Sequence, residues 1–169
     1  RVSIHREHPF ATPTAERDAA RRLRGRLAAP VTLWASGTGG GRAGLTVSSM
    51  LVALGQPSHV IGLLDPDTDL AALLDPGARF TVSVLGPAQR RVVEVFAGLG
   101  PSPGGPFAVA EFADTEWGPR PAASGTWAGV RVADVRPLGW SLEVTGVLER
   151  VTLGDDEGLV HLRGRLRTP

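Results

Sequence analysis

The feature that most constrains this chain is a glycine-rich stretch, residues 37–44, that joins two apolar segments. The segment before it, residues 31–36, has the β-branched and aromatic composition of a strand. The segment after it, residues 45–50, is rich in β-branched and hydroxyl residues. Because glycine adopts backbone conformations closed to other residues, the stretch between the two segments must bend sharply. Two interpretations of this bend compete.

In the first interpretation, Gly39, Gly41 and Gly44 match the G-x-G-x-x-G fingerprint, and Asp65 follows about 20 residues later, where a dinucleotide fold has its ribose-binding acid. That fold needs a helix to begin at the third glycine. The residues after Gly44 instead favour strands and turns. The rest of the chain also lacks the alternating strands and helices of a doubly wound sheet.

In the second interpretation, which we favour, the glycines form a hairpin turn. Its second strand then carries Thr46, Ser48 and Ser49. Hydroxyls and backbone N–H groups of such a strand can hold a ligand's phosphate or ring edge. The sequence therefore predicts a ligand site at this strand.

Composition indicates one soluble globular domain, with 169 residues of which 42% are hydrophobic and 21% charged. No apolar run approaches the roughly 20 residues that a membrane helix needs. The formal net charge is only +1, which does not indicate a nucleic-acid-binding face. The chain has no cysteine, so thiolate catalysis is excluded. We expect a cytoplasmic protein that binds neither nucleic acid nor membrane.

Histidine and serine spacing predicts neither a metal site nor a hydrolase. His5, His8, His59 and His161 form no i, i+4 pair on a helix. The serines, together with His161 and scattered acids, do not form a Ser/His/Asp pattern. We therefore expect no catalytic side chain of these types.

Hydrophobic periodicity predicts an N-terminal arm over residues 1–13 and one domain over residues 14–169. Helices are expected at 14–27, 69–75 and 87–97, and a surface loop or lid at 98–125. Strands are expected at 31–36, 45–52, 58–64, 80–85, 126–135, 140–151 and 159–166. The first helix carries Arg21, Arg22, Arg24 and Arg26, which we interpret as solvated charges matching the helix dipole, although they could also grip phosphates.

Five segments, in order and spacing, resemble the flavin reductase domain family with the FMN-binding split-barrel fold. They are residues 30–34, 44–50, 80–85, 96–98 and 159–164, and the similarity covers about residues 20–167. The resemblance implies a mainly β fold with flanking helices, an antiparallel split β-barrel. It also implies a homodimer that reduces FMN or FAD with NAD(P)H and supplies the reduced flavin to a monooxygenase or another acceptor.

The resemblance also implies which residues form the site. The residues expected to bind the flavin are Thr46, Val47, Ser48, Ser49, Met50, Asp67, Thr68, Phe96, Ala97 and Gly98. Those expected on the nicotinamide side are Trp140, His161 and Arg163. Flavin reduction depends on placing the two rings together and shielding them from water, so it needs no catalytic triad.

Two departures from the family's pattern leave a second function open. The basic residue usually offered to the flavin phosphate is replaced by Asp67, flanked by Asp65 and Asp69. Arg42 or Arg79 would have to compensate for these carboxylates. A Gly-Asp-His triplet of the family is replaced by residues 139–141, Gly-Trp-Ser. The alternative is therefore a flavin-binding protein with weak or no reductase activity.

Overall fold

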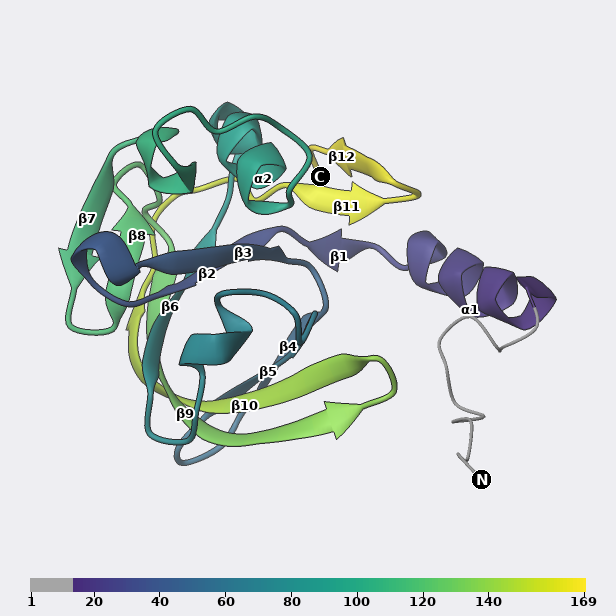
Figure 1. Cartoon of the computed structure of the whole chain (residues 1–169), viewed down its shortest axis with the longest axis horizontal. Coiled ribbons are helices and arrows are strands. Elements are labelled where there is room, and N and C mark those ends of the chain that lie inside the picture. The colour runs from purple at the N-terminus through teal and green to yellow at the C-terminus, as the bar shows by residue number, and fades with distance from the viewer. Residues whose placement is uncertain (1–13) are drawn as a thin grey trace, which may run out of the picture.

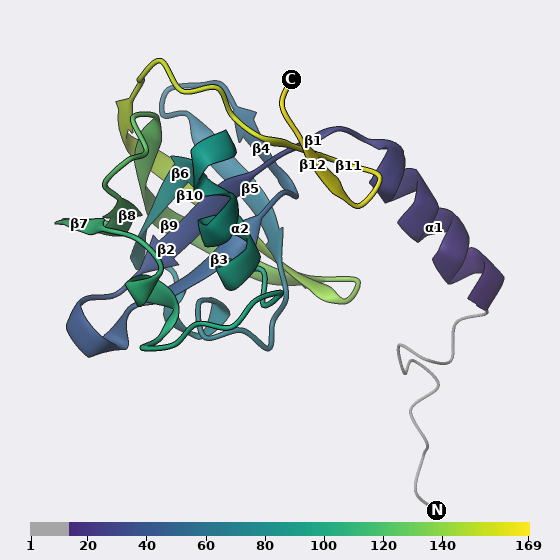
Figure 2. The same cartoon turned by 90° about the horizontal axis from the view of Figure 1, so that it is seen from above.

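The computed structural model describes residues 14–169, with side chains from residue 19 onward. The expected N-terminal arm, residues 1–13, lies outside the described residues. The molecule is a curled β-sheet with helix α2 (Arg90–Phe96) against its outer side, while helix α1 (Thr14–Arg26) projects from the barrel next to strand β1 (Figures 1 and 2). Within the described part of the chain, no helix is long and apolar enough to span a membrane.

The main sheet has seven antiparallel strands in the order β3-β2-β6-β9-β10-β5-β4. Their bounds, in that order, are Ala43–Val47, Thr32–Ser36, Arg79–Val84, Trp127–Leu138, Ser141–Thr152, His59–Leu64 and Met50–Ala53. The smaller elements are β1 (Ala29–Pro30), β11 (Val160–Leu162) and β12 (Arg165–Arg167) in a second sheet, the hairpin β7 (Phe112–Thr115) and β8 (Gly118–Pro121), and four 3₁₀ turns at Gly39–Gly41, Ala71–Leu73, Pro87–Gln89 and Pro106–Ala108.

Chain connectivity forces this sheet to close. The edge strands β3 and β4 are joined only by Ser48 and Ser49, a link that spans about 11 Å at full extension. In a flat sheet of seven strands the two edges would lie about 29 Å apart. The sheet must therefore curl until its edges meet, and β3 contacts β5 across this seam. The Leu63 N–H donates to the Ser49 carbonyl at 2.9 Å, which extends the β4–β5 pairing into the link.

Two apolar cores lie on the two sides of strand β2. Inside the barrel, Trp34 is fully buried and stacks on Phe80 with ring centroids 4.7 Å apart. Outside it, Leu33 packs in a cluster with Val93 and Phe96 of α2. Burial on both faces explains why residues 31–36 form an almost continuous apolar run rather than an alternating one.

The predicted fold class is confirmed, and so is the glycine hairpin, since β2 and β3 pair antiparallel across residues 37–42. Gly37 adopts a φ of +85°, which side-chain-bearing residues rarely adopt. The competing dinucleotide fold is wrong, because the chain forms a strand at Gly44 and not the start of a helix.

Four predicted boundaries are wrong. The strand expected at 45–52 breaks at Ser48 and Ser49, because the chain crosses there from one edge of the sheet to the other. The strand expected at 159–166 is a short hairpin, β11–β12, outside the main sheet. The helix expected at 69–75 is a single 3₁₀ turn, and the expected loop at 98–125 contains the β7–β8 hairpin. The hydrophobic periodicity of one segment does not reveal where the chain leaves one strand pairing for another.

Candidate functional site

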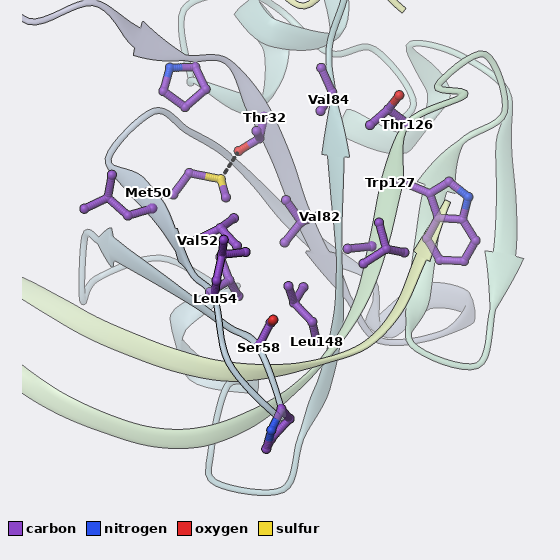
Figure 3. A pocket seen from close by; sticks show the side chains of 16 residues that line it. Thr32, Met50, Val52, Leu54, Ser58, Val82, Val84, Thr126, Trp127 and Leu148 are labelled. Atoms are coloured by element: carbon purple, nitrogen blue, oxygen red, sulfur yellow. Dashed lines mark hydrogen bonds between the residues drawn. The ribbon is translucent and has the colours of Figure 1, made fainter. Parts of the chain in front are cut away.

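The barrel surface has an apolar groove of about 800 Å³ (Figure 3). Its lining includes Thr32, Met50, Val82, Trp127 and Leu148, and none of the lining residues is charged. The Thr32 hydroxyl donates to the Val47 carbonyl at 2.6 Å and lies 3.4 Å from the Met50 sulfur inside the groove. The groove therefore suits an apolar occupant.

A second hollow, which we call the polar cleft, has a volume of about 490 Å³. It lies where the C-terminal end of α1, the β3–β4 link, the end of β5 and the β11–β12 hairpin come together. Its lining is mixed in character and consists of Arg21, Arg24, Gly25, Ala29, Leu45, Thr46, Val47, Ser48, Ser49, Leu63, Asp65, His161 and Gly164. The polar cleft is the candidate functional site.

Two features of the fold shape the walls of the polar cleft. β3 is an edge strand, so alternate N–H and C=O groups of residues 43–47 point away from β2. On the opposite chain segment, the Arg163 N–H donates to the Gly25 carbonyl at 2.7 Å, and Ala29 pairs with His161. These contacts fix the C-terminal end of α1 to the β11–β12 hairpin.

The three hydroxyls predicted to bind the flavin have different surroundings. The Thr46 hydroxyl donates to the Val93 carbonyl of α2 at 2.9 Å, so it ties the edge strand to the helix. Within the described residues, the side chains of Ser48 and Ser49 form no hydrogen bond. Ser48 is half-buried and Ser49 exposed. Ser48 and Ser49 are thus the hydroxyls most available to a ligand.

Several predicted flavin-binding residues do not line the polar cleft. Met50 points into the apolar groove, and Phe96 packs at 5.0 Å from the Phe107 ring in the cluster under α2. Ala97 and Gly98 are exposed at the end of that helix.

The acidic turn that follows β5 is held by its own hydrogen bonds. The Asp67 N–H donates to Asp65 Oδ1 at 2.9 Å, and the Thr68 hydroxyl donates to the Asp65 carbonyl at 2.9 Å. Thr68 also accepts the Ala71 N–H at 3.3 Å, at the start of the 3₁₀ turn. Asp65 lines the polar cleft, whereas Asp67 and Thr68 lie beside it.

The residues predicted on the nicotinamide side do not gather in the polar cleft. His161 lines it, while Arg163 lies in an adjoining hollow with Arg22 and Arg26. Trp140 is 57% exposed at the tip of the β9–β10 hairpin. Because Leu142 pairs with Leu64, this tip lies at the same end of the sheet as the turn that begins at Asp65.

The arginines expected to compensate for the acidic turn are engaged elsewhere. Arg42 donates to the Gly39 carbonyl at 3.0 Å, and its guanidinium lies 4.7 Å from the centre of the Phe107 ring. Arg79 pairs with Glu116 at 3.5 Å and with Glu149 at 3.6 Å.

The basic residues of the polar cleft are instead Arg21 and Arg24, which sequence reasoning treated as solvated charges. Their i, i+3 spacing, which places them on one helix face, was the available signal.

The residues of the polar cleft fit a flavin nucleotide. Leu45, Val47 and Leu63 supply apolar walls, Ser48 and Ser49 supply hydroxyls, and the α1 arginines supply positive charge. Such a mixture suits a ligand with a planar ring, a polyhydroxyl chain and an anionic end. In the part of the chain with described side chains, no three His, Cys, Asp or Glu residues gather as metal ligands.

The chain belongs to the flavin reductase like domain family, whose sequence profile matches residues 24–169. No curated protein sequence matches the chain.

Many solved structures share the fold, and three of them illustrate the likeness. The NADH:FAD oxidoreductase SgcE6 of Streptomyces globisporus C-1027 is 23% identical, with a TM-score of 0.81 over 92% of this chain and 94% of that one. Nitrilotriacetate monooxygenase component B of Mycobacterium thermoresistibile is 20% identical, with a TM-score of 0.79 over 90% and 86%. BorF, the flavin reductase component of a bacterial two-component tryptophan halogenase, is 23% identical, with a TM-score of 0.74 over 88% and 97%.

Proposed function

We propose that this protein reduces FMN or FAD with NAD(P)H and supplies the reduced flavin to a flavin-dependent monooxygenase or a related acceptor. The observation that carries the proposal is the coincidence of the family match with a polar cleft at the β3–β4 link. SgcE6 is an NADH:FAD oxidoreductase and has been solved with NAD and FAD fragments. BorF serves a halogenase, which supports an oxygenase-type partner.

The protein's part in this reaction is binding, orientation and exclusion of water. A bound flavin supplies the hydride-accepting chemistry. Thr46 and Val47 form the wall of the site, and Ser48 and Ser49 donate to or accept from the flavin. The other predicted residues lie outside the polar cleft, and we assign them a supporting role. They are Met50, Asp67, Thr68 and the end of α2, residues 96–98.

On the nicotinamide side we assign Trp140 and His161, with Arg163 more remote. An exposed indole offers a large planar face to an aromatic ring. Replacing Trp140 with alanine should raise KM for NAD(P)H several-fold and leave the flavin Kd unchanged. An equal loss in both constants would assign Trp140 a role in the flavin site or in the fold.

Activity is tested by following NADH and NADPH oxidation with FMN, FAD and riboflavin as acceptors, alongside flavin titrations by fluorescence. We expect flavin-dependent oxidation of at least one nicotinamide. Flavin binding without oxidation would support the alternative, a flavin-binding protein without reductase turnover. Absence of flavin binding would refute both.

We also propose that the protein is a homodimer formed through the apolar groove. Leu51, Leu54 and Val151 of the groove lining are 74%, 91% and 56% exposed. A surface that carries both a protruding apolar loop and an apolar hollow is self-complementary about a two-fold axis. A second copy therefore fits this face better than a charged partner does.

The oligomeric state is tested by light scattering after gel filtration. Leu54→Asp should shift the protein to monomer, because it places a carboxylate in the buried interface. Leu99→Asp is the matched control, since Leu99 is 80% exposed on the α2 side of the barrel. A wild-type monomer, or dimers from both variants, would refute the proposed interface. We further infer a cytoplasmic location, where NAD(P)H is available.

A further inference from the structure

Arg21 and Arg24 are the positively charged side chains that line the described part of the polar cleft. They lie on the last turns of α1 and share the cleft with Ser48 and Ser49. The α1 end that carries them is fixed to the β11–β12 hairpin through the Gly25 carbonyl. Their position is therefore set by the fold and not by the helix alone.

The charged groups around these arginines determine the net charge of the polar cleft. Asp65 is the acidic residue in the lining of the polar cleft, and its Oδ1 already accepts the Asp67 N–H. His161 also lines the cleft. Two guanidinium groups against one carboxylate leave the polar cleft with an excess of positive charge, although the neighbouring turn is acidic.

We propose that Arg21 and Arg24 hold the phosphate of the flavin nucleotide, replacing the basic residue that is absent from the acidic turn at residues 65–69. This inference rests on the proposed function and identifies the anion-binding part of the same site. Guanidinium groups form charge-assisted hydrogen bonds to phosphate oxygens, and two arginines on one helix face can share a single phosphate. The hydroxyls of Ser48 and Ser49 lie in the same hollow and suit the adjoining polyhydroxyl chain.

The competing explanation is that the arginines only compensate the negative end of the helix dipole. Arg22 and Arg26 lie on the same turns but line the adjoining hollow with Arg163. They provide a matched control because a double glutamine substitution there removes the same charge from the same helix end.

The experiment measures Kd for FMN and for riboflavin, at low and high salt, in the wild type, in Arg21→Gln/Arg24→Gln and in Arg22→Gln/Arg26→Gln. We expect the first variant to bind FMN about tenfold more weakly, with riboflavin changed less than about twofold. The control variant should keep FMN affinity within about twofold, and the loss should shrink at high salt. Circular dichroism checks that both variants fold.

The inference is overturned by equal losses of FMN affinity in both variants, by no loss in either, or by equal losses for FMN and riboflavin. If the first variant instead raised KM for NAD(P)H in the oxidation assay and left the FMN Kd unchanged, the arginines would bind the nicotinamide dinucleotide, and the inference would be overturned as well. A wild-type protein that binds FMN and riboflavin equally well also refutes it but leaves the proposed function standing. If the wild type binds no flavin, the proposed function fails first.

Discussion

Replacing Thr46 with valine removes a hydroxyl that ties β3 to α2 while keeping the shape of the side chain. The lost bond is the 2.9 Å contact to the Val93 carbonyl, which also accepts the Ala97 N–H at 3.0 Å. A carbonyl left without any partner would cost about 1–3 kcal/mol, whereas one lost bond among two costs about 0.5–1.5 kcal/mol. We therefore expect the free energy of unfolding to fall by about 1 kcal/mol.

Thermal unfolding measures this change, and for a domain of this size 1 kcal/mol lowers Tm by about 2–4 °C. Thr46→Ser keeps the hydroxyl and should recover most of the loss. Because the Thr46 hydroxyl already donates to the protein, Thr46→Val should change flavin Kd by less than about twofold.

Replacing Ser48 with alanine should have the opposite effects, weaker flavin binding with no loss of stability. Within the described residues the Ser48 side chain forms no hydrogen bond, so the free energy of unfolding should stay within about 0.5 kcal/mol. Flavin Kd should rise about fivefold, as expected for one lost bond of about 1 kcal/mol to the ligand. If Thr46→Val weakened flavin binding without lowering Tm, the Thr46 hydroxyl would face the ligand, and a purely structural role for it would be refuted.

Three further predictions concern the core, a surface network and the acidic turn. Gly62→Ala would place a Cβ 2.7 Å from Cζ2 of the buried Trp34. We therefore expect the free energy of unfolding, measured in urea, to fall by about 1–3 kcal/mol, and adding Trp34→Phe should partly restore it. Full stability of the single variant would contradict this expectation. The indole N–H of Trp117 donates to Glu149 and holds the pKa of this carboxyl below its ordinary value. The ionised Glu149 therefore stabilises the folded state above about pH 4.3, and this contribution is lost as pH falls. Tm should drop more steeply in acid for the wild type than for Glu149→Gln, and parallel plots of Tm against pH would contradict this role. Asp67→Lys should tighten FMN binding by up to about 1 kcal/mol at low salt and leave riboflavin unchanged, whereas equal effects on both ligands would assign the turn a structural role.

Local sequence determined the class of the fold. The glycines at 37–44 permit a bend, and the residues on either side of them favour strands, so the β2–β3 hairpin follows from backbone conformation and side-chain shape alone. The order of five short segments then identified the family, which the sequence profile over residues 24–169 confirms.

The tertiary structure alone decided which residues share a hollow. Periodicity placed the residues from Leu45 to Val52 on one strand, yet the curl of the sheet sends Ser48 and Ser49 to the polar cleft and Met50 to the apolar groove. Nothing local distinguishes these neighbours, because the break depends on two sheet edges meeting.

The same limit applies to charge. Arg21, Arg22, Arg24 and Arg26 are alike in sequence, and helix geometry separates them into two faces. The contacts of Gly25 and Ala29 with the β11–β12 hairpin, more than a hundred residues later in the chain, bring one face to the polar cleft. Which arginines a ligand meets is therefore a long-range property, whereas the strand-forming character of residues 31–50 is a local one.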